Sequence, residues 1–77
     1  MIHMREKMLQ ALKEHAKGHI KKHTMNVEVY LTNPVGIGEH PDVIDAVEKE
    51  LDEIARYHDQ LEVIKEYLEK WKKSNQL

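Results

Sequence analysis

The fold is decided by one stretch near the middle of the chain, Asn33-Pro34-Val35-Gly36-Ile37-Gly38-Glu39-His40-Pro41, which holds both prolines and two of the three glycines. Proline disfavours helical geometry at the residue before it, so a helix is expected to end near Asn33. Gly36 and Gly38 permit the positive φ angles of a tight reversal. Pro41 suits the first turn of a new helix. The stretch therefore predicts a loop over about 33–40 between two long elements.

The element after the loop has the clearer pattern, because its apolar residues recur at alternating steps of three and four, as in a heptad seam. The members of this row are Ile44, Val47, Leu51, Ile54, His58, Leu61 and Leu68, with Lys65 as the one charged member. Asp42 and Asp45 follow Pro41, where negative charge stabilises a helix start. The pattern predicts a helix over about 41–72, followed by a short basic tail.

The element before the loop also carries a helical stripe, although a noisier one. Its apolar members are Met4, Met8, Leu9, Leu12, Ala16, Ile20, Val27, Tyr30 and Leu31. They predict a helix over about 2–32. Within it, 26–32 alternates apolar and polar residues and is rich in β-branched ones, which is also typical of a strand. A lone strand would need another copy of the chain as its partner, so we favour the continuous helix.

Two helices of nearly equal length joined by one loop predict an all-α fold, a long antiparallel hairpin in which residues whose numbers sum to about 73–74 lie opposite each other. A chain of 77 residues buries a modest core, and small domains commonly add stability by oligomerisation. We therefore expect a dimer or larger helical bundle. The expected oligomer seam consists of Leu12, Ile44, Val47, Leu51, Ile54, Leu61 and Leu68.

The charge is distributed unevenly along the chain, although the net charge is only −2. Residues 1–25 carry six Lys or Arg and two acidic residues, whereas residues 26–69 carry three basic and twelve acidic residues. Opposed halves of this kind bind each other or bind partners. We favour the first interpretation, in which a basic helix folds back on an acidic one.

Six histidines in so short a chain raise the question of a metal site. His15, His19 and His23 share one helix face, and the hairpin register places His15 opposite His58. We therefore weigh a zinc site formed by His15, His19 and His58, with a nearby carboxylate as a further ligand. The motifs of zinc proteases and di-iron bundles are missing. The favoured interpretation needs no cofactor, with the histidines as seam or surface residues; a pH-responsive seam is a further alternative.

Two other features are weaker signals of binding. Lys13, Lys17, Lys21 and Lys22 form a basic row that could contact nucleic-acid phosphates. However, the chain as a whole is acidic, and no aromatic residue precedes Tyr30 to stack on bases. Gly36-Ile37-Gly38 is similar to a fragment of a phosphate-binding loop, but the lysine and Ser/Thr of that motif are missing, so a turn is the better interpretation.

The sequence gives no support for catalysis, and we expect a non-enzymatic protein. Neither Thr24 nor Thr32 has the context of a nucleophile, and the chain has no cysteine. The carboxylates recur at helical spacing, as on a solvated helix face.

There is no apolar run that would span a membrane and no signal-peptide core, so we expect a cytoplasmic protein.

The segment from Asn26 to Leu68, with the loop Asn33–His40 at its centre, resembles a family of small uncharacterised proteins of contractile-tailed phages of marine bacteria. The resemblance implies a viral protein that acts in the cytoplasm of an infected cell or is carried in the virion, with a host or virion protein as a further partner. It supplies no site residues.

The apolar tip of the loop is a candidate partner-binding site, formed by Val35, Gly36, Ile37, Gly38 and His40.

Overall fold

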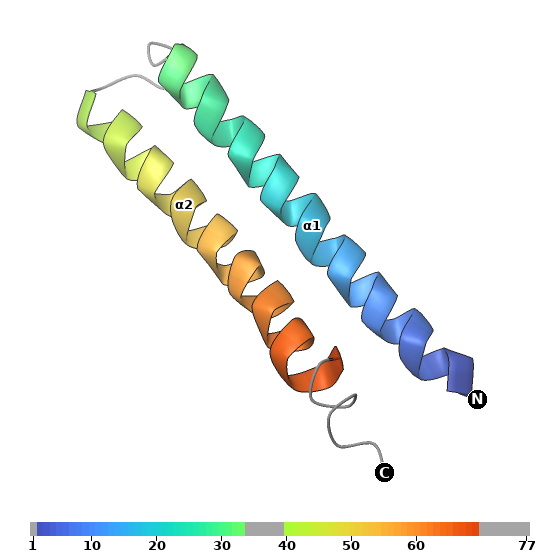
Figure 1. Cartoon of the computed structure of the whole chain (residues 1–77). Coiled ribbons are helices and arrows are strands. Elements are labelled where there is room, and N and C mark those ends of the chain that lie inside the picture. Colours follow the sequence, from blue (N-terminus) through green and yellow to red (C-terminus); the bar gives the residue numbers. More distant parts are fainter. Residues whose placement is uncertain (1, 34–39, 70–77) are drawn as a thin grey trace.

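The computed structural model describes residues 2–33 and 40–69, and the side chains of 4–33 and 42–69. It consists of α1 (Ile2–Thr32), α2 (His40–Val63) and a terminal π-helix, η2 (Ile64–Glu69). The helices run antiparallel along their whole length (Figure 1). We call the end near Thr32 and His40 the turn end, and the end near Ile2 and Glu69 the open end. The predicted all-α hairpin is confirmed.

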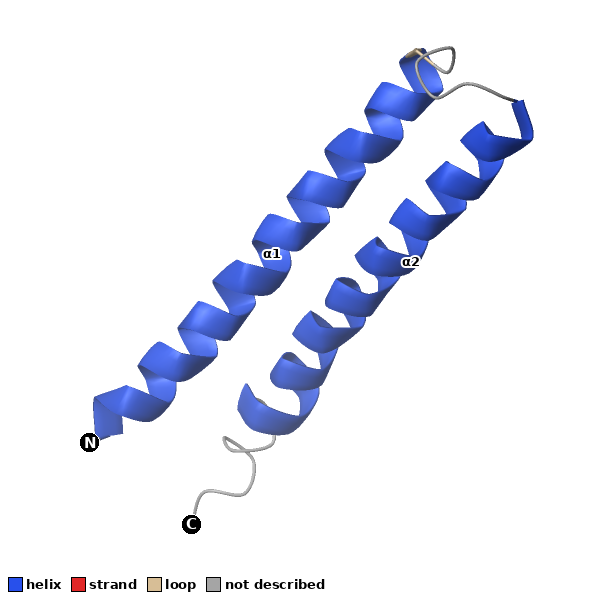
Figure 2. Cartoon of the chain, turned by 180° about the vertical axis from the view of Figure 1, so that it is seen from behind, coloured by secondary structure: helices blue, strands red, loops and turns tan. Residues whose placement is uncertain are grey.

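All the described residues except Asn33 are helical, so the alternative strand over 26–32 is excluded (Figure 2). These residues form the last two turns of α1. The Asn33 amide still donates to the Val29 carbonyl at 2.9 Å, and the Thr32 hydroxyl donates to the Glu28 carbonyl at 2.8 Å. Helical bonding therefore continues up to the residue before Pro34, as the steric effect of proline predicts.

Contacts between the two helices follow the expected register. Nδ1 of His23 lies 2.6 Å from Oε1 of Glu50, and the Arg5 guanidinium donates to the Leu68 carbonyl at 2.8 Å. Both pairs of residue numbers sum to 73. Along α1, the residues turned toward α2 include Leu9, Ile20, Val27 and Tyr30, which are half-buried. They face half-buried Val43, Val47, Ile54 and Leu61 of α2.

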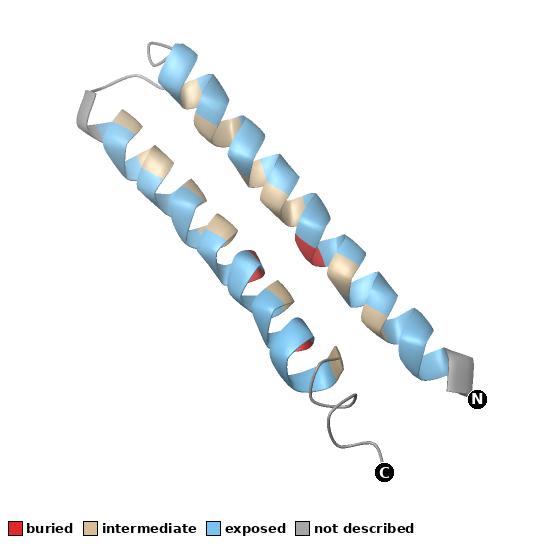
Figure 3. Cartoon of the chain, viewed as in Figure 1, coloured by how far each residue is buried: buried red, intermediate tan, exposed pale blue. Residues whose placement is uncertain are grey.

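The core of the hairpin is small (Figure 3). Among the described side chains, only Ala16, Tyr57 and Ile64 are buried. Ala16 is 0% exposed, and the register places it opposite Tyr57, which is also buried, so a small side chain lies opposite a large one. A two-helix layer has solvent on both faces, which explains why most apolar side chains keep substantial exposure.

The seam of α2 differs from the predicted row at every second position, where the residue one place earlier in the chain faces α1. Val43, Val47, Glu50, Ile54 and Tyr57 face α1, whereas Ile44, Leu51 and His58 are exposed. Only Val47, Ile54 and Leu61 of the predicted seam are half-buried between the helices. The reason is that α2 has apolar residues on two adjacent rows, and the row starting at Val43 makes the intramolecular contact.

The end of the second helix also differs from the regular α-helix expected there. Residues Ile64–Glu69 form η2, whose wider turn brings together residues about five apart rather than four. Ile64 is buried and Glu69 is half-buried, while Leu68 is 38% exposed. Glu69 therefore takes the place facing α1 that the heptad pattern gave to Leu68, and Lys13 forms a salt bridge to it at 2.6 Å.

Candidate functional site

An exposed apolar strip lies at the turn end of the described part of the chain. Leu31 of α1 and Ile44 and Leu51 of α2 are 61%, 70% and 52% exposed. Together with Val43 and Val47 they line an open groove of about 340 Å³, with Glu48 at its rim. We refer to Leu31, Val43, Ile44, Val47 and Leu51 as the apolar strip. It forms because the second apolar row of α2 emerges beside the seam.

A second apolar cluster lies toward the open end. Leu12 and Val63 are 55% and 49% exposed and line a shallow groove with Asp59, Gln60 and Ile64. Leu12 is thus separated from Ile44 and Leu51, with which it was expected to share an oligomer seam. The other members of that expected seam also lie in different places. Ile44 and Leu51 belong to the apolar strip, Leu68 lies in η2, and the half-buried members between the helices are Val47, Ile54 and Leu61.

Three histidines form a ladder along α1 beside Tyr57. The ring centroids of His15 and His19 are 4.5 Å apart, and those of His19 and His23 are 5.8 Å apart. His19 also stacks on Tyr57, with centroids 4.3 Å apart and an interplanar angle of 10°. Nδ1 of His19 is buried and has no hydrogen-bond partner among the described residues. Burial, assisted by the neighbouring His15, lowers the pKa of His19 below its ordinary value of 6.5.

A polar cluster lies inside the hairpin next to this ladder. The Glu50 carboxylate accepts hydrogen bonds from His23 at 2.6 Å and from Asn26 at 3.0 Å. The His23 and Glu50 side chains are only 13% and 16% exposed. The bond from His23, followed by the bond from Asn26, holds the pKa of Glu50 below its ordinary value of 4.5. Removing Glu50 would take the acceptor from both His23 and Asn26, and a polar group shielded from water is costly to leave unsatisfied.

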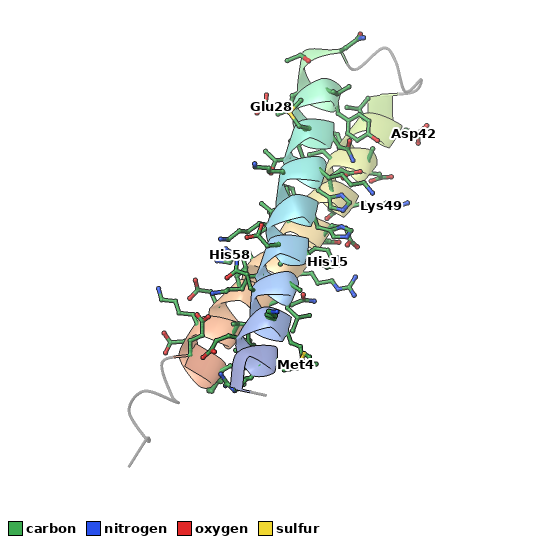
Figure 4. All side chains as sticks on the ribbon, turned by 90° about the vertical axis from the view of Figure 1, so that its right-hand side faces the viewer. Met4, His15, Glu28, Asp42, Lys49 and His58 are labelled. Carbon is green, nitrogen blue, oxygen red and sulfur yellow. The ribbon has the colours of Figure 1, made fainter. Side chains whose placement is uncertain are left out.

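The expected convergence of His15, His19 and His58 does not occur. His15 and His19 are adjacent, but His58 lies on the opposite side of the hairpin from His15 (Figure 4). The correct register was not enough, because Tyr57 occupies the seam position predicted for His58 and contacts the ladder in its place. Among the described residues, no group of three or more His, Cys, Asp or Glu side chains is placed to hold a metal ion.

The remaining predicted sites have different outcomes. Of the basic row, Lys13 is engaged with Glu69, while Lys17, Lys21 and Lys22 are exposed on α1. Val35, Gly36, Ile37 and Gly38 lie outside the described residues, and the side chain of His40 does too. The basic tail also lies outside them. Within the described part of the chain, neither helix is long and apolar enough to cross a membrane.

Sequence reasoning missed Glu50, Asn26 and Tyr57. Glu50 resembles the many other acidic residues of α2, and no spacing rule distinguishes a buried carboxylate from a solvated one. Its only sequence signal is the alternative heptad row, in which Val43, Val47, Glu50 and Ile54 occupy successive seam positions.

Comparison of the chain with protein-family models, curated proteins and solved structures found no match.

Proposed function

We propose that this protein is a non-enzymatic interaction protein whose hairpins self-associate through the apolar strip to form a four-helix bundle. One observation carries the proposal: among the described side chains, only three are buried, while Leu31, Ile44 and Leu51 are each more than half exposed. Exposed apolar side chains gathered in one groove are typical of association sites. If the two-helix hairpins of two copies stack on each other, the four amphipathic helices form a bundle with one shared core.

The area of exposed surface supports this proposal. The chain exposes 6320 Å², whereas a compact monomer of this mass exposes about 4,900 Å². The surplus is of the order of 1,400 Å², and a standard interface buries about 800 Å² of each partner. A surplus of this size is expected for an elongated two-helix layer with an uncovered face, and it exceeds one partner's share of a standard interface.

The decisive experiment is to measure mass in solution by light scattering across a concentration series. We expect the wild-type chain to be a dimer at micromolar concentration and the Ile44→Asp/Leu51→Asp variant to be a monomer. Val29→Asp is the matched control, because Val29 is 52% exposed on α1 but does not line the groove. A wild-type chain that stays at 9.1 kDa at tens of micromolar would refute the proposal, because standard-size interfaces have dissociation constants of about micromolar or below.

The setting of this assembly follows from the sequence resemblance to phage proteins. We propose that the hairpin acts in the cytoplasm of an infected bacterium or in the virion, with a host or virion protein as a further partner. Mass spectrometry of purified virions and a pull-down from infected cells test the two settings separately.

A further inference from the structure

We infer that two copies of the chain pack with their turn ends at the same end of the bundle, so that α1 of each copy lies against α2 of its partner. This inference rests on the proposed function and specifies the geometry of the dimer. Two arrangements with twofold symmetry stack the strip-bearing faces of two hairpins. In one the turn ends coincide; in the other the turn ends point in opposite directions, and each helix lies against its own copy.

The distribution of side chains along this face favours the first arrangement. The row of Ile44 and Leu51 continues, one heptad at a time, to His58 and Lys65. The row of Leu31 continues in the other direction to Thr24, Lys17 and Gln10, and all of these are exposed. The face is thus apolar only toward the turn end and polar toward the open end.

Only the same-end arrangement brings the two apolar strips together while the hairpins overlap along their full length. In the opposite-end arrangement with full overlap, the strip of each copy would face the polar row of the other. Sliding the copies would restore contact between the strips, but about half of each hairpin would then extend beyond its partner. The same-end arrangement therefore buries more apolar surface for the same contact area.

Charge favours the same arrangement independently. α1 carries six Lys or Arg and three Glu, whereas α2 and η2 together carry ten Asp or Glu and three Lys or Arg. In the same-end dimer each basic α1 faces an acidic α2 of the partner. In the opposite-end dimer acidic α2 faces acidic α2, and like charges across an interface oppose association.

The closing experiment is a distance measurement between spin labels by pulsed electron resonance. The chain has no cysteine, so Met4→Cys, at the open end of α1, gives a single labelling position. The same-end dimer predicts a distance below about 30 Å between the two labels, and the opposite-end dimer predicts more than about 40 Å, given ~1.5 Å rise per residue and ~10 Å between helix axes.

The outcomes separate the two proposals. A dimer with the short distance supports the inference. A dimer with the long distance overturns the inference and leaves self-association intact, whereas a monomer by light scattering refutes the proposed function itself. As a control, Ile44→Asp/Leu51→Asp in the labelled chain is expected to abolish the dipolar signal, since the short distance should require contact through the strip.

Discussion

Nδ1 of His23 lies 2.6 Å from Oε1 of Glu50, inside the hairpin and across its seam. The pair links the last third of α1 to the first half of α2, and Asn26 donates a second bond to the same carboxylate. A carboxylate at a seam position forms its bonds in one alignment of the two helices only. A shift by one heptad would place Glu50 opposite Ala16 or Tyr30, with His23 and Asn26 out of reach.

Replacing Glu50 should therefore destabilise the hairpin. We expect Glu50→Ala to lower the free energy of unfolding by about 1–3 kcal/mol, because His23 and Asn26 would lose their acceptor while remaining largely buried. Urea denaturation followed by circular dichroism measures the change. Glu62→Ala, on the exposed surface of α2, is the control and should stay within about 0.5 kcal/mol of the wild type. Equal effects of the two substitutions would contradict a special role for Glu50.

Acidification should destabilise the protein in two steps. The pKa of His19 is lowered in the folded state, so the unfolded chain binds more protons as the pH falls below 6.5. The pKa of Glu50 is lowered as well, so a second loss is expected below pH 4.5. Both shifts have the same sign, and stability should rise with pH through both windows. Thermal melts at fixed protein concentration and several pH values measure this dependence.

The variant His19→Phe isolates the first step. It keeps an aromatic ring to stack on Tyr57 but cannot be protonated, so its melting temperature should change less than that of the wild type between pH 7 and pH 5. The two proteins differ at this position only, so the difference between their pH dependences measures the effect of the His19 imidazole. If the two proteins show the same pH dependence in this window, the buried imidazole is not responsible for it.

Enlarging Ala16 should be costly. Ala16 is 0% exposed, and overpacking a filled seam costs about 1–3 kcal/mol through displaced side chains or backbone. We expect Ala16→Leu to lower the melting temperature and to disrupt the stacking of His19 on Tyr57. The same change at Ala55, which is exposed on α2, is the control. Similar melting temperatures for both variants would show that the helices separate readily at this point.

Gly18 offers a stabilising substitution. A Cβ atom added to Gly18 would meet no atom within 4 Å, and alanine is favoured over glycine within a helix by about 0.5–1 kcal/mol. Gly18→Ala should therefore raise the free energy of unfolding by about that amount, measured by denaturant titration. A decrease would indicate that glycine at this position has a role in an assembled form, where a partner helix approaches α1 closely.

The sequence was sufficient to predict the hairpin and its register, because Pro34 and Pro41 bracket a single reversal and the helices on either side have matching lengths. It was not sufficient to predict which row of α2 faces α1. The row with Ile44 and Leu51 is as apolar as the row with Val43 and Tyr57. Hydrophobic periodicity cannot show which of two adjacent apolar rows makes the contact with α1. The true seam includes Glu50, which a rule based on apolar residues rejects.

The candidate site was correspondingly harder to predict than the fold. Val43, Glu50 and Tyr57 replace Ile44, Leu51 and His58 in the seam, while Val47, Ile54 and Leu61 keep their places. The contact face of α2 is therefore turned by about 50°, half of the ~100° between successive residues. This turn is enough to move His58 away from His15 and to bring Tyr57 to His19. The apolar strip has the same origin, since Ile44 and Leu51 lie beside the contact with α1 and are exposed. Side-chain pairing across a seam depends on this rotation, and single-sequence patterns leave it undetermined.

The π-helical turn η2 contains more residues than an α-helical turn would need at the open end of the hairpin. Between Ile64 and Glu69 it holds one residue more than an α-helical turn requires to bring the same two side chains to α1. A chain shortened by one residue in this segment would close the turn as an ordinary α-helix and still present Glu69 to Lys13. Insertions and deletions are therefore better accommodated here than beside Glu50, where one residue more or less would break the alignment of the helices.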